Sequence, residues 1–156
     1  MKKLVINQTL TGKLLEGFHE MDSGELIKFY GSDANRCGLY DEERHMAVIV
    51  SWNKPKLLGF LADERAAVKG AEARFRRNLQ NYRHVDTLNA TIAGRQAVGV
   101  RFEYNPDGTD IVQYGELYAF KHERVYYFMQ VIGRKERFEE DQRLEDEFIR
   151  SVTVLP

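Results

Sequence analysis

The side chains with the greatest capacity for chemistry are one cysteine and four histidines, which are Cys37, His19, His45, His84 and His122. Cys37 and His45 flank a predicted hairpin turn, so they would form a nucleophile and its base if their side chains met across that turn. A histidine beside a carboxylate, as in His19-Glu20, is a second arrangement suited to proton transfer. A cysteine in an apolar strand is most often only packed, so we expect Cys37 to be structural and inert.

No spacing in the sequence matches a metal or phosphate motif. The histidines form neither an HExxH nor a CxxC pattern, and Glu43-Arg44-His45 would join His19-Glu20 as ligands only if folding brought the two together. No glycine cluster links a predicted strand to a predicted helix ahead of a GK[ST] sequence, which excludes a P-loop. We therefore predict no catalytic residue, no metal and no cofactor, and interpret the histidines as solvated loop residues.

Composition restricts the class of protein. A chain of 156 residues with 43% hydrophobic and 30% charged side chains is not disordered, and its length fits a single domain that spans residues 1–156 around one core. No run approaches the roughly 20 apolar residues of a membrane span, and the apolar segment Leu4–Ile6 is too short for the core of a signal peptide. With one cysteine and no internal disulfide, we expect a cytoplasmic protein.

The charges are distributed unevenly although the formal net charge is only -1. Basic residues cluster near the end of one predicted helix, at Arg74, Arg76, Arg77, Arg83 and His84. Acidic residues crowd another, at Glu139, Glu140, Asp141, Glu145, Asp146 and Glu147. The aromatic neighbours Phe75 and Tyr82 fall on the apolar stripe of the basic helix, so we expect no nucleic-acid binding there. The acidic helix is interpreted as a solvated face.

Three extended segments must position any site, and they are residues 97–104, 111–120 and 124–132. Their β-branched and aromatic composition and the turn signals between them predict a meander of antiparallel strands. The last segment is apolar on both faces and therefore needs cover on both sides. Amphipathic helices predicted at 63–81 and 136–150 would supply it, giving an α+β fold with helices on both faces of a central antiparallel sheet.

The remaining elements follow from shorter patterns. They are a strand at 3–10, an irregular connection in which Phe18 fills the core, a short helix after Asp22 that ends at Gly31, a hairpin of strands at 37–40 and 46–52, a strand at 84–93 and an extended tail at 151–155. We expect one core to contain Phe102, Tyr127, Met129, Phe75 and Phe148.

This order of elements resembles the PsbP-like fold group. The resemblance covers nearly the whole chain and is carried by the paired-tyrosine strand VYYFMQVIG, a closing helix that ends in FIRSV, and the segments EGFHEMDSGEL and HMAVIVSW. The group includes the extrinsic PsbP subunit of photosystem II, a Ran-GTPase-binding protein and small bacterial proteins without known activity. The resemblance implies an α/β/α sandwich and a binding or accessory role, and no catalytic residue is carried over.

We predict a non-catalytic binding or protein-interaction module. Loops and strand ends remain for a ligand once helices cover the sheet, and the candidate residues are Phe18, His19, Glu20, Tyr40, Glu43, His45 and Trp52. We expect the segments 16–23 and 40–45 to lie together with Trp52 beside them, and Tyr114 and Tyr118 are further candidate contacts if they are exposed. The alternatives are a small hydrolase-like enzyme that uses Cys37 or a histidine–carboxylate pair, and an accessory subunit of an assembly. The partner is an unspecified protein or small molecule, and the expected state is a monomer or weak homodimer.

Overall fold

A seven-stranded antiparallel sheet forms the centre of the molecule. The computed structural model describes residues 2–54 and 63–156. The strand order is β3-β4-β5-β9-β8-β7-β6. The strands are β3 (His19–Glu20), β4 (Arg36–Asp41), β5 (Met46–Asn53), β6 (Gln80–Ile92), β7 (Arg95–Asn105), β8 (Gln113–His122) and β9 (Val125–Arg134). Consecutive pairing of β7, β8 and β9 confirms the predicted meander, and the α+β class is confirmed with it.

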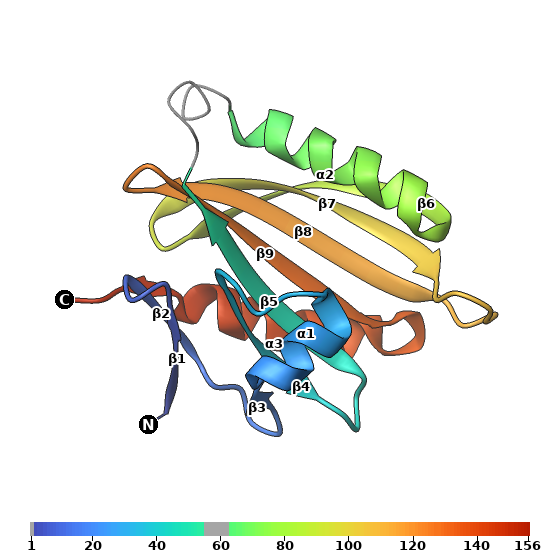
Figure 1. Ribbon diagram of the computed structural model, residues 1–156, viewed down its shortest axis with the longest axis horizontal. Coiled ribbons are helices and arrows are strands. Elements are labelled where there is room, and N and C mark those ends of the chain that lie inside the picture. The colour runs from blue at the N-terminus through green and yellow to red at the C-terminus, as the bar shows by residue number, and fades with distance from the viewer. Residues whose placement is uncertain (1, 55–62) are drawn as a thin grey trace.

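Helices cover both faces of this sheet, as predicted. Helix α2 (Glu64–Asn78) packs on one face through Val68 and Ala71, and α1 (Ser23–Tyr30) covers the β4–β5 end of the same face. Helix α3 (Phe138–Ser151), preceded by the 3-10 turn η2 (Lys135–Arg137), lies on the opposite face (Figure 1). The short α1 was predictable because Asp22 and Glu25 form a capping box and Gly31 ends the helix with a left-handed φ of 76°.

A second, smaller sheet corrects the prediction for the N-terminal segment. One strand was predicted at 3–10, but the chain folds back as a hairpin of β1 (Lys3–Ile6) and β2 (Leu10–Lys13). The reversal occurs at Asn7 and Gln8, both of which have positive φ angles, and neither is a glycine that would have marked the turn. The C-terminal strand β10 (Thr153–Val154) pairs with β2, so the predicted extended tail completes this three-stranded sheet (Figure 1).

The long helix α2 ends earlier than predicted. Its last residue is Asn78, and Leu79 already has extended backbone that leads into β6. Tyr82 therefore lies on a strand, although its ring still stacks on Phe102 at 5.3 Å between centroids. A side chain three or four residues beyond the end of a helix can still pack against the residues that a longer helix would contact. For this reason the apolar periodicity predicted a helix that was too long. The predicted stripe position Leu61 lies outside the described residues.

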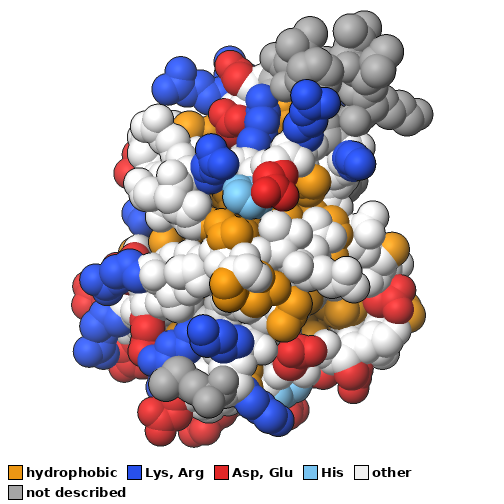
Figure 2. Space-filling model, turned by 90° about the vertical axis from the view of Figure 1, so that its left-hand side faces the viewer, with side chains coloured by type: hydrophobic (Ala, Val, Ile, Leu, Met, Phe, Trp, Pro, Cys, Tyr) orange, Lys and Arg blue, Asp and Glu red, His pale blue; other side chains and the backbone are white. Residues whose placement is uncertain are grey.

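The sheet separates two hydrophobic clusters, so the prediction of one shared core is wrong. Phe102 and the half-buried Phe75 belong to the α2 side, whereas Tyr127, Met129 and Phe148 belong to the α3 side. Alternate residues of β9 belong to different clusters because successive side chains of a strand point to opposite faces of the sheet. From the side that carries the chain termini, Figure 2 shows hydrophobic side chains in a band across the middle, below a group of Lys and Arg side chains at the level of α2.

Candidate functional site

The two predicted loop segments lie side by side. Strand β3 pairs with β4 so that His19 faces Tyr40, and their rings meet edge to face with centroids 5.9 Å apart. The exposed His19 is also hydrogen-bonded to Glu25 of α1 at 2.8 Å, which fixes β3 to the start of that helix. The expectation that the segments 16–23 and 40–45 meet is therefore confirmed.

Trp52 does not join them, and its predicted placement is wrong. It stands at the far end of β5 from His45, pairs with Tyr127 of β9, and packs against the α3-side cluster. Tyr40 shares a face with Ile49 and the α1 cluster, so Trp52 also lies on the other side of the sheet. The prediction failed because a strand rises by about 3.3 Å per residue, so the last residue of a strand that begins beside a site lies far from that site.

The other predicted residues have separate surroundings. Phe18 is 7% exposed and fills the α3-side core, as predicted. The exposed Glu20 lies opposite Leu39, and Glu43 lies in the β4–β5 turn, where its backbone N–H donates to the Asp41 carboxylate. Tyr114 and Tyr118 are buried at 2% and 7% exposure, so they are not surface contacts.

A groove opens beside His19 and Tyr40 on the face of the sheet that α1 and α2 leave uncovered between them. Its volume is about 220 Å³, and its lining consists of Met21, Phe29, Tyr30, Tyr40, His45, Ala47, Tyr104, Gln113 and Ile132. We call it the tyrosine groove. At its edge Phe29 is 48% exposed, and its ring is tilted against that of Tyr40 with centroids 5.5 Å apart. Ile27 of the same helix is 52% exposed. Large apolar side chains held at the surface beside a hollow are typical of a contact site.

Two tyrosine hydroxyls of the tyrosine groove are uncharged at physiological pH. Burial raises the pKa of Tyr104 to about 12, and burial together with the neighbouring tyrosines raises that of Tyr30 further, so both hydroxyls stay protonated. Tyr104 donates its proton to the side-chain oxygen of Gln113 at 2.7 Å. Beside Tyr40 the surrounding charges are mainly acidic, because Glu42, Asp41 and Glu25 act on its hydroxyl against Arg134, whereas Lys28 Nζ lies 5.4 Å from the centroid of the Phe29 ring. The groove therefore presents aromatic surface with a border that is acidic beside Tyr40.

The structure gives Cys37 and His45 no common site. Cys37 pairs with Val50, whereas His45 lies in the turn at the other end of the β4–β5 hairpin. Burial, with a smaller contribution from Glu20, raises the pKa of the Cys37 thiol to about 12, which leaves almost no thiolate at neutral pH. Three histidine–carboxylate pairs do form, which are His19–Glu25, His84–Glu72 and, at 3.8 Å, His122–Glu123, but in the described part of the chain no hydroxyl or thiol is hydrogen-bonded to any of these histidines.

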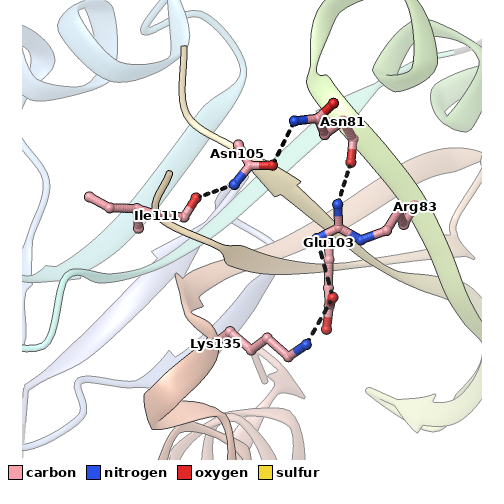
Figure 3. A network of polar contacts seen from close by, with 6 residues as sticks. All are labelled: Asn81, Arg83, Glu103, Asn105, Ile111 and Lys135. Carbon is pink, nitrogen blue, oxygen red and sulfur yellow. Dashed lines mark hydrogen bonds and ion pairs between the residues drawn. The ribbon is translucent and has the colours of Figure 1, made fainter. Parts of the chain in front are cut away.

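A larger cleft of about 440 Å³ lies between the α3 end of the molecule and strands β6 to β8, but several polar side chains of its lining already form ion pairs. Its lining includes Arg101, Glu103, Tyr114, Lys135 and Phe138. Glu103 accepts from Lys135 at 3.3 Å and from Arg83 at 3.5 Å, and the same network continues through Asn81 and Asn105 to the carbonyl of Ile111 (Figure 3). These contacts connect β6, β7, the β7–β8 loop and η2, so we interpret the cleft as structural.

Beneath this cleft lies a buried acidic cluster that sequence reasoning missed. Glu116, Asp141 and Glu145 are 0%, 0% and 1% exposed, although the acidic residues of this helix were predicted to form a solvated face. Glu116 accepts from Arg101 and from Gln142, and Tyr114 donates to Asp141 at 2.7 Å. A signal existed, because Asp141 and Glu145 are spaced i, i+4 on the same helical stripe as Phe138 and Phe148.

The surroundings of Glu145 in this cluster favour its protonated form. Burial raises its pKa well above the ordinary value, and a hydrogen bond with Glu116 raises it further. Oε1 of Glu116 and Oε1 of Glu145 are both buried without a hydrogen-bond partner among the described residues. Two neighbouring buried carboxyl groups are less costly to bury when one of them is protonated. The polar interior thus combines Glu145, whose protonated form is favoured, with Asp141 and with Glu116, which pairs with the Arg101 guanidinium.

Replacing Glu145 by Gln is expected to change how stability depends on pH. The folded state keeps the proton of Glu145 while the unfolded chain releases it above about pH 4.3, so wild-type stability falls as pH rises from there through the raised pKa, by at most about 1.4 kcal/mol per pH unit. Gln cannot ionise, so the variant should gain stability relative to wild type as the pH rises above about 4.3 in urea titrations. Glu139→Gln, an exposed acid on the same helix, is the control. Parallel pH profiles for wild type and Glu145→Gln would contradict the protonated state.

Comparisons with known proteins identify the fold. No family model and no curated protein matches the sequence. The chain is similar in structure to the cyanobacterial PsbP of Synechocystis at TM-score 0.64 and 10% identity, covering 99% of this chain and 92% of that one. It is also similar to the Ran-binding protein Mog1p of Saccharomyces cerevisiae at TM-score 0.63 and 9% identity, covering 98% and 94%. A third structure, LpqN of Mycobacterium tuberculosis, described as involved in cell envelope biogenesis, has TM-score 0.63 and 11% identity, covering 94% and 83%.

The chain therefore has the PsbP-like fold, as its sequence pattern implied. At these identities the likeness concerns architecture, and a site must be argued from the residues of this chain. Over the described residues, no group of three or more His, Cys, Asp or Glu side chains is arranged to hold a metal ion. Nor does any described helix combine the length and apolar character that crossing a bilayer requires.

Proposed function

We propose that the protein is a non-catalytic binding module that receives an apolar side chain of a partner protein in the tyrosine groove. The observation that carries the proposal is Phe29, a large apolar side chain held 48% exposed on a capped helix beside a hollow lined by three tyrosines. Tyrosine-rich pockets with a rigid frame are typical anchors in protein interfaces because they bury much area at little entropic cost. Of the residues predicted from sequence, the proposal uses His19, Tyr40 and His45.

The size and charge of the groove favour a protein segment over a small molecule. Its volume of about 220 Å³ is below the roughly 300–1,000 Å³ of most small-molecule pockets but sufficient for one large side chain. The acids that act on Tyr40, Glu42 first among them, favour a Lys or Arg residue beside that anchor. Mog1p, which shares the fold, is described as a Ran-binding protein, so this architecture serves protein recognition in at least that case.

Short peptides of defined sequence test the proposal. An acetylated, amidated Lys-Trp-Lys peptide should produce saturable shifts in the amide NMR signals of Tyr30, Tyr40 and Tyr104, and a Glu-Trp-Glu peptide should bind more weakly because of the acidic border. Phe29→Ser should weaken binding about fivefold, the loss expected of a contact worth about 1 kcal/mol. Its exposure predicts that the variant stays folded.

The matched control is Val5→Ser, which removes a similarly exposed apolar side chain, 50% exposed, from the small sheet. It should leave peptide binding unchanged. Equal affinity for both peptides, or shifts confined to residues outside the tyrosine groove, would refute the proposed site.

A further inference from the structure

Helix α2 leaves a second groove open along the opposite edge of its face of the sheet. The helix packs over β7 and β8 through Val68 and Ala71, and the edge strand β6 extends beyond it. The space between has a volume of about 300 Å³. Its lining consists of Arg65, Val68, Lys69, Glu72, His84, Thr87, Asn89, Val98, Gly99 and Val100. We call it the α2–β6 groove.

The side chains along the floor of this groove divide into an apolar half and a polar half. Val98 and Val100 of β7 lie opposite Asn89 and Thr87 of β6, so all four point to the α2 face. Val68 of the helix closes the apolar half from above. The hydroxyl of Thr87 and the amide of Asn89 make no side-chain hydrogen bond with the described residues, so both remain available to a ligand.

The α2–β6 groove carries an excess of positive charge. The one acidic side chain, Glu72, is already satisfied, because it accepts from the Tyr82 hydroxyl, from His84 at 2.8 Å and from Arg76 at 3.4 Å. Those contacts outweigh the effect of burial and lower the pKa of Glu72. Arg65 and Lys69, one turn apart on α2, form no ion pair with any described residue. Two cations thus stand over an apolar floor without a counter-ion from the described chain.

We propose that the α2–β6 groove binds a small organic anion with an apolar tail, its head group paired with Arg65 and Lys69 and its tail lying on Val68, Val98 and Val100. Lys and Arg side chains at the rim favour a carboxylate through charge-assisted hydrogen bonds. The volume is at the lower limit for small-molecule pockets and suits a tail of a few carbons. This site is separate from the tyrosine groove and does not depend on the function proposed for it.

Three simple probes at equal concentration and ionic strength distinguish specific binding at this site from non-specific binding. Hexanoate should give saturable shifts in the NMR signals of Thr87, Asn89 and Val98, whereas acetate, which lacks the tail, and hexylammonium, which reverses the charge, should not. Shifts of equal size with acetate would reduce the effect to surface charge. Equal shifts with hexylammonium would reduce it to apolar contact, and either result, or no saturable shift with hexanoate, overturns the proposal.

Charge-reversal variants on one helix supply the matched comparison. Arg65→Glu with Lys69→Glu should weaken hexanoate binding about tenfold, since two favourable exposed ion pairs are lost. Arg74→Glu with Arg77→Glu makes the same change in net charge at exposed positions of α2 that do not line the groove, and binding should persist. An equal loss in both double variants would show a long-range charge effect and refute the site. Unchanged amide signals in α3 verify that each variant is folded.

Discussion

Truncating Phe148 to Ala is expected to lower the free energy of unfolding by about 3–5 kcal/mol, which is a large part of the stability of a domain of this size. Phe148 is 0% exposed and joins α3 to both sheets, because its ring lies so close to β2 that a Cβ on Gly12 would stand 2.8 Å from it. Removing the ring leaves a cavity between rigid elements that cannot collapse to fill it. Urea denaturation monitored by far-UV circular dichroism measures the loss.

The same experiment tests the division of the core by the sheet. Phe102 is also 0% exposed but belongs to the α2-side cluster. The milder changes Phe148→Leu and Phe102→Leu should each cost about 1 kcal/mol and should add in the double variant, because the two rings have no shared neighbours. Strong coupling between them, or an unchanged denaturation midpoint in either alanine variant, would contradict the two-cluster arrangement. Phe75→Ala should cost less, since Phe75 is only partly buried.

Local signals in the sequence were sufficient for most of the architecture. The turn-forming Asn105-Pro106-Asp107-Gly108 and the alternating apolar residues of β7 and β9 predicted the meander, and Asp22 and Gly31 predicted both ends of α1. These patterns act within a few residues, so they hold whatever the tertiary contacts are. The turn at Asn7 and Gln8 escaped prediction because non-glycine residues adopt positive φ there, which only the pairing of β2 with β1 and β10 stabilises.

The candidate site was predicted only in part, for reasons of geometry. His19 and Tyr40 meet because β3 adds to β4, a pairing of two residues that no sequence period reveals. Tyr30 and Tyr104 complete the groove from α1 and β7, which are far apart in the chain and become neighbours only when the sheet forms. The burial of Asp141 and Glu145 likewise depends on partners from β7 and β8, so composition alone indicated a solvated helix.

The buried polar cluster and the two grooves have different consequences for function. Glu116, Glu145 and Arg101 lie on the α3 face, whereas the tyrosine groove and the α2–β6 groove open on the α2 face. Hydrogen bonds within the cluster fix α3 to the sheet in one register, which a purely apolar contact would specify less strictly. The α2 face can then present two recesses of different chemistry on a frame that binding need not reorganise.

Replacing Arg101 by Met is expected to cost about 3–5 kcal/mol of unfolding free energy at neutral pH, the loss typical of removing one partner from a buried ion pair. Arg101 Nε donates to Glu116 Oε2 at 2.5 Å, and its guanidinium stacks over Phe138 at 4.7 Å, so the side chain both compensates the charge of Glu116 and closes the packing against α3. Met keeps much of the apolar length of arginine, so the measured loss of unfolding free energy reports mainly on the missing charge.

The double variant Arg101→Met with Glu116→Gln isolates that charge. A neutral amide at position 116 no longer requires a cation, and Gln142 can still hydrogen-bond to its oxygen, so most of the stability should return. Chemical denaturation of wild type, Arg101→Met and the double variant at the same pH gives the comparison. A loss below about 1 kcal/mol in Arg101→Met would mean that the pair behaves as an exposed surface salt bridge. If Glu116→Gln does not restore stability, the unpaired charge of Glu116 is not the cause of the loss in Arg101→Met. The guanidinium would then stabilise the fold through its packing on Phe138.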